Sequence, residues 1–274
     1  METRNNQVSR EPMTPEELSM WVAQKQEQRD TVYAMIESQT EHVFSDPKNL
    51  NDHLKRQATF GKMGVSNVLL VGAQKPDATE IRSFDDWNKR KRSVKKGEKA
   101  IAILETKGEY TQEDGTPRQN FGVKSVFDVS QTYGKDLRQW QPASTKSVVN
   151  AMLKKFPIEI VASNTTASAR FDKDSLQMEV NRNQRPEQML YAVAREFGVS
   201  EGLDTFEAKC AASVVCYRYG VTPDAIDKIP NKVVGMEHKE LKSLLGRIRD
   251  CAATICDHID HNLQQERQRK QEER

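Results

Sequence analysis

The sequence predicts an α+β fold whose helices and short strands are divided between two domains. Long stretches carry apolar residues at helical spacing, whereas short segments between them are rich in β-branched residues. The length of 274 residues is long for one core and sufficient for two modest ones. We expect a disordered tail over 1–14, a first domain over 15–142, a second over 143–263 and a charged tail over 264–274.

The first domain opens with a helix that has a clear start signal. Thr14 is a good cap, Pro15 suits the first helical position, and glutamates follow. The apolar positions are interrupted over 24–30, so two helices or one bent helix both fit. The elements expected after it are helices over 50–60 and 65–74, a short helix capped by Ser83, and strands over 100–106 and 121–132. We expect the two strands to form a hairpin with a long connection.

The second domain is mainly helical. A linker and helix over 141–157 precede two short strands that flank a turn at 171–174. The elements expected there are strands over 158–164 and 176–182, and helices over 187–198, 205–220 and 236–263. The last helix carries its apolar residues on one stripe, and from Gln264 onward only charged residues and glutamine remain. We expect that tail to be frayed or disordered.

Composition excludes several classes of protein. No apolar run approaches the roughly 18 residues of a membrane helix, and the N-terminus lacks the apolar core of a signal peptide. The four cysteines fit no paired metal or redox spacing, and each lies in an apolar helical stretch. We therefore expect buried free thiols, a reducing cytoplasmic location, no cofactor and no membrane partner.

A basic turn precedes the first long strand. Between Arg82 and Lys99 there are eight basic and three acidic residues, a balance of about +5, in a chain with a net charge of only +2. The basic residues are Arg82, Lys89, Arg90, Lys91, Arg92, Lys95, Lys96 and Lys99. Trp87 lies beside the turn, and Tyr133 and Trp140 follow the second strand. Cations for phosphates and flat rings for unpaired bases are what single-stranded nucleic acid requires. The alternative is a solvated lysine face with Trp87 in the core.

Ordered identities around this turn carry a resemblance to a known family. The positions are Ser66, Asn67, Leu69, Leu70, Gln74, Pro76, Ala78, Thr79, Trp87, Val94, Lys95, Gly97, Glu98, Lys99, Val126, Phe127, Asp128, Val129 and Gln131. In this order they resemble the N-terminal domain of the ArdC antirestriction proteins and the LtrC-like proteins of conjugative plasmids and transposons. The resemblance covers roughly residues 30–135 and implies a sequence-tolerant domain that binds single-stranded DNA.

The resemblance also suggests candidate contact residues. Besides the basic turn, Trp87 and Tyr133, the candidates are Asn67, Gln74 and Lys75. Asn67 and Gln74, seven residues apart on one helix face, fit structural cross-links as readily as contacts to DNA. We expect Gly97 to allow the turn a positive backbone angle.

The second half resembles a zinc-peptidase-like domain that those relatives carry. There, an H-E-x-x-H helix is followed by a helix with an acidic third ligand. Here Tyr191 and Arg195 stand at the histidine positions, Ala192 replaces the glutamate, Glu207 remains and Lys209 takes the second acidic place.

Zinc needs deprotonated N, S or O donors, and arginine has no acceptor and stays charged. No histidine occurs between His53 and His238. We expect a degenerate metallopeptidase-like domain that holds no metal and has no catalytic residues. Our hypothesis is that Arg195 and Glu207 form an ion pair, and the alternative is that both side chains are exposed on the surface.

The sequence thus predicts a non-enzymatic, sequence-tolerant single-stranded DNA-binding protein of a plasmid or other mobile element, acting in conjugation or DNA protection. The alternative is an interaction protein whose peptidase-like half binds a conjugation or host-defence protein. The pattern contains no nucleophile–base pair, P-loop or dinucleotide fingerprint that would support an enzyme of another kind.

Overall fold

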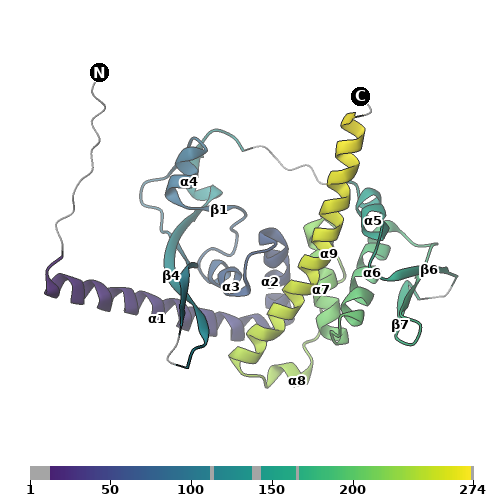
Figure 1. Ribbon diagram of the computed structural model, residues 1–274, viewed down its shortest axis with the longest axis horizontal. Helices are drawn as coiled ribbons and strands as arrows, with labels where there is room; N and C mark the ends of the chain where they lie inside the picture. The colour runs from purple at the N-terminus through teal and green to yellow at the C-terminus, as the bar shows by residue number, and fades with distance from the viewer. Residues whose placement is uncertain (1–12, 112–113, 138–142, 165–166, 273–274) are drawn as a thin grey trace.

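The computed structural model describes residues 13–111, 114–137, 143–164 and 167–272, and its mixture of helices and three small sheets confirms the α+β prediction (Figure 1). The N-terminal half consists of helices around a long hairpin. The C-terminal half is mainly helical, with a small sheet at its far side. Helix α9 (His238–Glu272) crosses the middle of the view and packs against helices of both halves.

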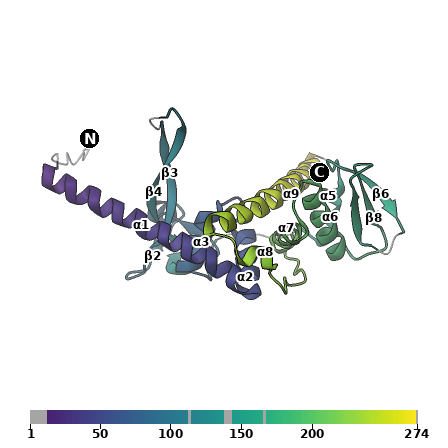
Figure 2. The same ribbon diagram turned by 90° about the horizontal axis from the view of Figure 1, so that it is seen from below.

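Helix α1 (Pro15–Ser45) is one continuous helix, so the polar stretch at 24–30 does not break it. Thr14 and Glu17 form the expected capping box, in which each side chain accepts the backbone N–H of the other residue. Only the C-terminal part of α1, from Val32 onward, contributes to the core. Its N-terminal part extends away from the body of the protein (Figures 1 and 2).

Helices α2 (Pro47–Phe60) and α3 (Val65–Gln74) pack beside α1, and α3 lies against the hairpin. The hairpin is formed by β3 (Ile101–Thr111) and β4 (Pro117–Asp128), which pair antiparallel as predicted. Strand β1 (Ile81–Arg82) pairs with the other side of β4 and leaves β3 at the edge of the sheet.

Side-chain amides from α3 occupy that edge. Asn67 donates to the carbonyl of Leu104 at 2.9 Å and accepts its N–H at 2.8 Å. Gln74 makes the same pair of bonds with Ala102, both at 2.9 Å. Unpaired edge groups would invite pairing with another chain, so these bonds protect the edge. The structural role of Asn67 and Gln74 is confirmed, because both amides are engaged by the strand. Their role as DNA contacts stays a prediction.

The basic turn contains a strand of its own. Helix α4 (Phe84–Lys89) is capped by Ser83 as predicted, and β2 (Arg92–Val94) follows it. The short helix η1 (Val129–Gln131) leads from the hairpin into β5 (Thr132–Gly134), which pairs antiparallel with β2.

Asp128 fixes the point where β4 ends and this second sheet begins. Its carboxylate, only 1% exposed, accepts backbone N–H groups of Thr79 at 2.7 Å, Glu80 at 3.0 Å and Ser130 at 2.8 Å. Burial by itself would raise the pKa of Asp128, but these hydrogen bonds outweigh it and hold the pKa below its ordinary value. An ionised Asp128 therefore joins the backbone of Thr79 and Glu80 to the start of the turn at Ser130.

The C-terminal half carries the predicted strands and helices. Helix α5 (Thr145–Leu153) leads to strands β6 (Glu159–Ser163), β7 (Ala169–Asp172) and β8 (Gln177–Asn181), which form one sheet in the order β6-β8-β7. The sequence predicts only a turn at 171–174, but the structure has a third strand, β7, whose last two residues, Phe171 and Asp172, fall in that range. Helices α6 (Pro186–Ser200), α7 (Thr205–Arg218) and α8 (Asn231–Val234) follow.

The C-terminal tail differs from the prediction. Helix α9 continues to Glu272, so the expectation of a frayed or disordered segment from Gln264 is wrong for the residues described. Glutamine, glutamate, arginine and lysine all favour helix, and a helix already anchored by its apolar stripe extends readily through them. The expected disordered N-terminal tail lies almost entirely in 1–12, outside the described residues.

The core runs through both halves. One hydrophobic cluster includes Val32 and Leu54 from the first half and Val215 and Ile248 from the second, while a smaller cluster lies under the hairpin. Helix α2 packs directly against α7. The division at 142/143 stays a prediction, since 138–142 lie outside the described residues. No helix among the described residues has the length and apolarity needed to cross a bilayer.

The cysteines are free thiols, as predicted. Cys210, Cys216 and Cys251 are buried and Cys256 is half-buried. Burial raises the pKa of Cys216, Cys251 and Cys256 to about 12 in each case, so these thiols stay protonated and unreactive at neutral pH.

Candidate nucleic-acid interface and interhelical cleft

Strands β2 and β5 present the basic turn as a two-stranded element, which we call the basic ribbon (residues 90–99 and 132–135). Arg92 lies opposite Gly134 in the register, and Ser93 lies opposite Tyr133. Gly134 has φ +133°, and a Cβ added to it would lie 2.4 Å from the carbonyl oxygen of Lys91. Only glycine allows the two backbones to approach this closely. Gly97 has φ +88°, which confirms the positive angle expected for the turn.

Three charged residues of the basic ribbon hold its shape. The Arg92 guanidinium donates to the hydroxyl of Thr132 at 2.8 Å and to the carbonyl of Lys135 at 2.6 Å. Lys95 Nζ donates to the carbonyl of Ser130 at 2.8 Å. The carboxylate of Glu98 accepts from Gln131 Nε2 at 3.0 Å. Arg92 and Lys95 keep their charges on the surface, but their positions are fixed by backbone carbonyls.

Other cations of the basic ribbon are available to a ligand. The side chains of Arg90, Lys91, Lys96 and Lys99 are exposed and have no hydrogen-bond or ion-pair partner among the described residues. Lys135, which the sequence did not single out, is a fifth of this kind. It lies beyond the cluster in the sequence and joins it only through the pairing of β5 with β2.

Two other predicted cations are already paired. Lys89 Nζ lies 3.1 Å from Asp86, and Lys75 Nζ lies 2.9 Å from Asp77. The Lys75 side chain is 24% exposed, so it is also the less accessible of the two. Both pairs lie near the surface, where an incoming phosphate can compete with the carboxylate.

The aromatic residue chosen from the sequence is not on the surface. Trp87 is 0% exposed and donates from Nε1 to the carbonyl of Phe127 at 2.8 Å. Its predicted role as a base-stacking platform is therefore wrong, because an amphipathic helix of six residues buries its largest apolar side chain. Tyr133 is 61% exposed and is the available ring of the basic ribbon. Trp140 lies outside the described residues.

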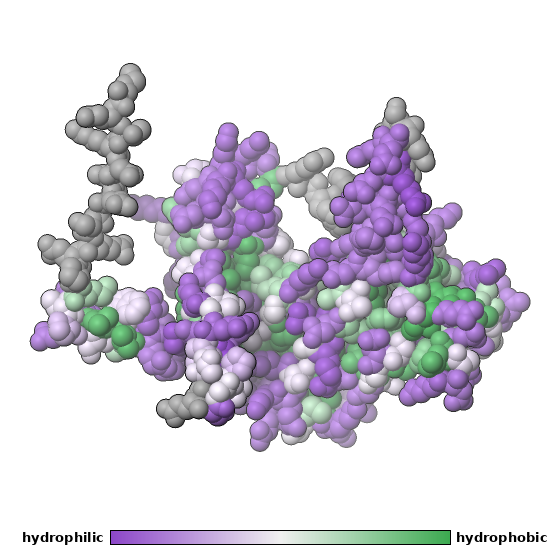
Figure 3. Space-filling model, viewed as in Figure 1, coloured by the Kyte–Doolittle hydropathy of each residue, from purple (hydrophilic) through white to green (hydrophobic). Residues whose placement is uncertain are grey.

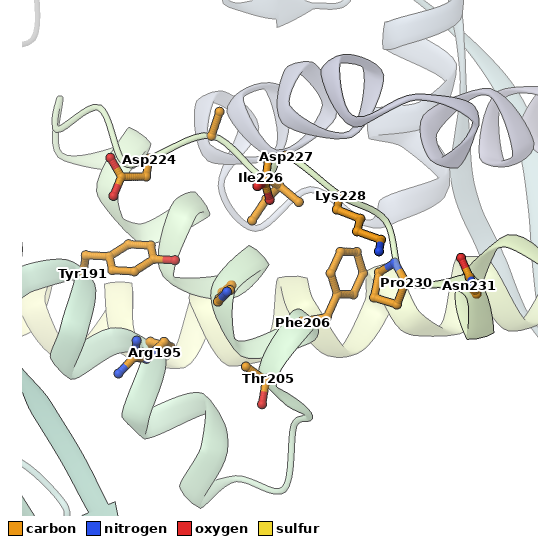
Figure 4. A pocket seen from close by; sticks show the side chains of 12 residues that line it. Tyr191, Arg195, Thr205, Phe206, Asp224, Ile226, Asp227, Lys228, Pro230 and Asn231 are labelled. Atoms are coloured by element: carbon orange, nitrogen blue, oxygen red, sulfur yellow. The ribbon is translucent and has the colours of Figure 1, made fainter. Parts of the chain in front are cut away.

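The second candidate region is a cleft between α6, α7 and the loop at 221–231. A cavity of about 810 Å³ is lined by Tyr191 and Arg195 from α6 and by Phe206 and Lys209 from α7. Figure 4 shows the Tyr191 ring pointing from α6 into the space beside the loop that carries Asp224, Asp227 and Lys228, whereas the Arg195 guanidinium points away from that loop. The structure thus brings Tyr191, Arg195 and Lys209 together around one cavity.

Arg195 is paired with its own neighbour. It donates from Nε and Nη2 to Glu196 Oε1 at 2.9 and 2.6 Å, while Glu196 Oε2 accepts the N–H of Phe171 at 2.9 Å. Glu207 instead accepts from Arg247 of α9 and is only 5% exposed. The hypothesis of an Arg195–Glu207 ion pair, and the alternative that both side chains are exposed, are therefore wrong. Glu207 lies on the face of α7 that packs against α9, away from Arg195.

None of the cleft side chains singled out from the sequence offers an anionic donor to a metal ion, and the carboxylates of the cleft are Asp224 and Asp227 of the loop. Tyr191 is half-buried and burial raises its pKa to about 12, so its hydroxyl stays protonated at neutral pH. Ala192 is 3% exposed and lies in the core, and Arg195 and Lys209 are cations without a lone pair to offer. Across the residues that the structure describes, no three His, Cys, Asp or Glu side chains lie close enough together to hold a metal.

The sequence matches none of the known protein-family models and none of the curated proteins. Among solved structures, the chain is similar to the metal-free antirestriction protein ArdC from the R388 plasmid, with 16% identity and a TM-score of 0.46 over 73% of this chain and 83% of that one. It is also similar to the Mn(II)-bound form, with 17% identity and a TM-score of 0.48 over 78% and 97%. Both are the protein whose family the sequence motifs resemble. At this level the likeness concerns the course of the backbone.

Proposed function

We propose that this protein binds single-stranded DNA through the basic ribbon. The supporting observation is the set of unpaired, exposed side chains of Arg90, Lys91, Lys96 and Lys99 on the same ribbon as Tyr133, which is 61% exposed. Flexible ammonium groups can follow a phosphate backbone, and a flat ring can stack on any unpaired base. A two-stranded β-ribbon can also enter the major groove of a duplex, so a double-stranded oligonucleotide of the same length is the comparison that tests the preference for single strands.

The same side chains favour binding that tolerates any sequence. Reading a base requires amide or guanidinium groups fixed in plane against its edge. Asn67 and Gln74 have their amides bound to β3, and Arg92 has its guanidinium bound to backbone carbonyls. Of the available cations, Lys91, Lys96 and Lys99 are point charges on flexible stems, which recognise phosphate and not sequence. Arg90 is a guanidinium that no contact among the described residues fixes in one plane.

We further propose that the α6–α7 cleft performs no metal-dependent hydrolysis. Arg195 and Lys209 offer positive charge where a metal site needs lone pairs. A role in the transfer or protection of plasmid DNA, as the motif resemblance implies, is part of the same proposal. Purified protein that carries stoichiometric metal and cleaves peptides would contradict the non-enzymatic part.

The test is the affinity for a labelled oligonucleotide across a salt series. About five phosphate contacts predict a slope near −3.5 in a plot of log affinity against log salt, because single strands give about −0.7 per contact. The variant Arg90→Glu/Lys96→Glu/Lys99→Glu should lose on the order of a hundredfold in affinity at low salt. The matched control, Lys146→Glu/Lys173→Glu/Lys239→Glu, reverses three exposed or partly exposed lysines on other elements and should retain most of the affinity. Equal losses in the two variants would point to net charge alone and against the basic ribbon.

A protein-binding role is the second candidate, and the α6–α7 cleft favours it. The cleft is open, mixes cations and carboxylates and has Phe206, Ile226 and Pro230 on its wall. Such a surface suits a polypeptide better than a polyanion. If the protein ignores single strands even in dilute buffer, the DNA-binding proposal fails and this candidate takes its place.

A further inference from the structure

A groove lies where the N-terminal part of α1 crosses the β3–β4 hairpin, a crossing seen in both ribbon views (Figures 1 and 2). Its volume is about 510 Å³. The residues that line it are Trp21, Val22, Lys25, Gln26 and Arg29 from α1, and Lys107, Gly122 and Val123 from the hairpin. Trp21, Lys25 and Arg29 are four residues apart in turn and so form one stripe along the helix.

This part of α1 keeps an unusual amount of apolar surface in water. Leu18 is 49% exposed, Trp21 45% and Val22 53%, whereas the first buried residue of the helix is Val32. Figure 3 shows the corresponding hydrophobic patch at the protruding end of α1. An exposed tryptophan at a groove is a binding group in many interfaces, because its ring offers a large flat apolar surface.

The charge of the groove narrows the choice of ligand. Its lining includes Lys25, Arg29 and Lys107 and contains no carboxylate. The cleft between α6 and α7 and the pocket beside α2, by contrast, each include two aspartates. Lys107 is bound to Glu105, but Glu105 is shared with Lys124, so this small cluster keeps a net positive charge. A polyanion fits such a surface better than an ordinary peptide.

Trp21 and Lys25 are placed for a base and its phosphate. Lys25 Nζ lies 6.0 Å from the centre of the Trp21 ring and Arg29 follows one turn later, with no partner of its own in the described part of the chain. On the opposite wall of the groove, Gly122 has no side chain, and the flexible stem of Lys107 lies over its backbone. A ring and two cations at successive turns match the alternation of base and phosphate along a single strand.

We propose that the groove between α1 and the hairpin is a second contact site for single-stranded nucleic acid, in which a base stacks on Trp21 while Lys25, Arg29 and Lys107 face the phosphates. This site rests on the proposed function and extends the footprint beyond the basic ribbon. It also replaces Trp87, which the core buries, by an aromatic residue that a base can reach.

The intrinsic fluorescence of Trp21 provides a direct test. In a Trp140→Phe background only Trp21 and the buried Trp87 remain, so stacking should quench the emission when a 20-nucleotide oligo(dT) is added. Trp21→Phe should abolish the quench while retaining most of the affinity. Trp21→Ala should weaken binding on the order of tenfold, since one stacked base contributes an effect of about that size. Tyr33→Ala is the matched control, because Tyr33 is 43% exposed on the same helix and does not line the groove.

The outcomes separate the groove from the basic ribbon. Loss of the quench in Trp21→Phe and loss of affinity in Trp21→Ala, with Tyr33→Ala unchanged, support the site. Unchanged affinity of Trp21→Ala together with no quench, while the charge reversals in the basic ribbon still abolish binding, overturns the groove and leaves the proposed function intact. The groove is also overturned if Trp21→Ala dissociates a dimer in sedimentation without changing DNA affinity, because a second copy would then cover α1. Absence of any binding by the parent protein overturns both proposals.

Discussion

The basic ribbon and the α6–α7 cleft contain similar kinds of charged residue and use them differently. In the basic ribbon, the carboxylate of Glu98 is held by Gln131, while the side chains of Lys96 and Lys99 have no partner among the described residues. In the cleft, Arg195 is bound to Glu196 and the remaining cations share the cavity with Asp224 and Asp227. The ribbon therefore presents an uncompensated positive field and the cleft does not.

This difference shows that the field at the surface depends more on which charges are available to a ligand than on the number of charged residues. A count along the sequence gives Arg92 and Lys96 the same weight, although Arg92 is bound to two backbone carbonyls and Lys96 projects freely. Phosphates respond to the field that remains after internal pairing. We expect variants that disturb the backbone of the ribbon to have the largest effects and single-charge variants to have the smallest.

The largest effect is expected from Gly134→Ala. The new Cβ would lie 2.4 Å from the carbonyl oxygen of Lys91, at a φ of +133° that side chains rarely adopt. Strain of this kind costs about 1–3 kcal/mol by itself, and the clash with backbone adds to it. We expect a fall in the unfolding midpoint in urea and a loss of DNA binding, since β2 and β5 can no longer pair.

Gly97→Ala is the control for that variant. Gly97 also has a positive φ, +88°, but nothing lies within 4 Å of an added Cβ. It should cost only the conformational strain, about 1–2 kcal/mol, and leave the pairing of the ribbon intact. Equal effects of the two variants would mean that the close backbone approach at Gly134 is unimportant.

Acid should weaken the packing of helix α2, which lies against α7. His53 of α2 is fully buried and burial lowers its pKa to about 3, from an ordinary value near 6.5. The unfolded chain therefore binds a proton below about pH 6.5 that the folded protein refuses, so stability falls as the pH falls. Between pH 7 and pH 5 this group alone removes about 2 kcal/mol. Thermal unfolding at both pH values should show a smaller difference in Tm for His53→Leu than for the parent.

Local patterns in the sequence carried enough information for the elements and several turns. The capping box at Thr14, the hairpin and the positive φ of Gly97 depend on neighbours in the chain, and the structure confirms all three. The separation of seven residues between Asn67 and Gln74 indicated that they share a helix face. It did not reveal the partner, because the edge of β3 lies 37 residues away from Asn67 in the chain.

Side-chain orientation was harder to predict. Trp87 occurs beside eight basic residues, yet a six-residue helix placed its ring in the core. Glu207 and Arg247 are 40 residues apart, and their pairing follows from the packing of α7 on α9, which no local pattern specifies. Trp21 occupied an ordinary apolar position in a predicted helix, and its exposure appeared only with the protruding end of α1.

The ion pairs beside the cleft should contribute unequally to stability. Arg247→Ala leaves Glu207, whose side chain is 7% exposed, with the N–H of Asp204 at 3.3 Å. Arg195→Ala leaves Glu196 with the stronger bond from Phe171 at 2.9 Å. Since both arginines are partly solvated, we expect about 1–2 kcal/mol for Arg247→Ala and about 1 kcal/mol or less for Arg195→Ala. Calorimetry that ranks Arg195→Ala as the more damaging change would show that the cleft depends on Arg195 for its stability.

The smallest and most specific effect is expected from removing one charge at a time. Lys96→Ala should reduce the salt slope of DNA binding by about 0.7 and the affinity by roughly threefold to fivefold in 0.1 M salt, because one phosphate contact is lost. Lys209→Ala removes the same charge from the cleft and should leave the slope unchanged, since Asp224 and Asp227 oppose a polyanion there. Stability should not change in either variant, as both lysines are exposed.

Fluorescence anisotropy at four or more salt concentrations measures both the affinity and the salt slope. A slope that falls equally for the two lysines would mean that DNA responds to the total charge of the protein, and the distinction between ribbon and cleft would then have no functional content.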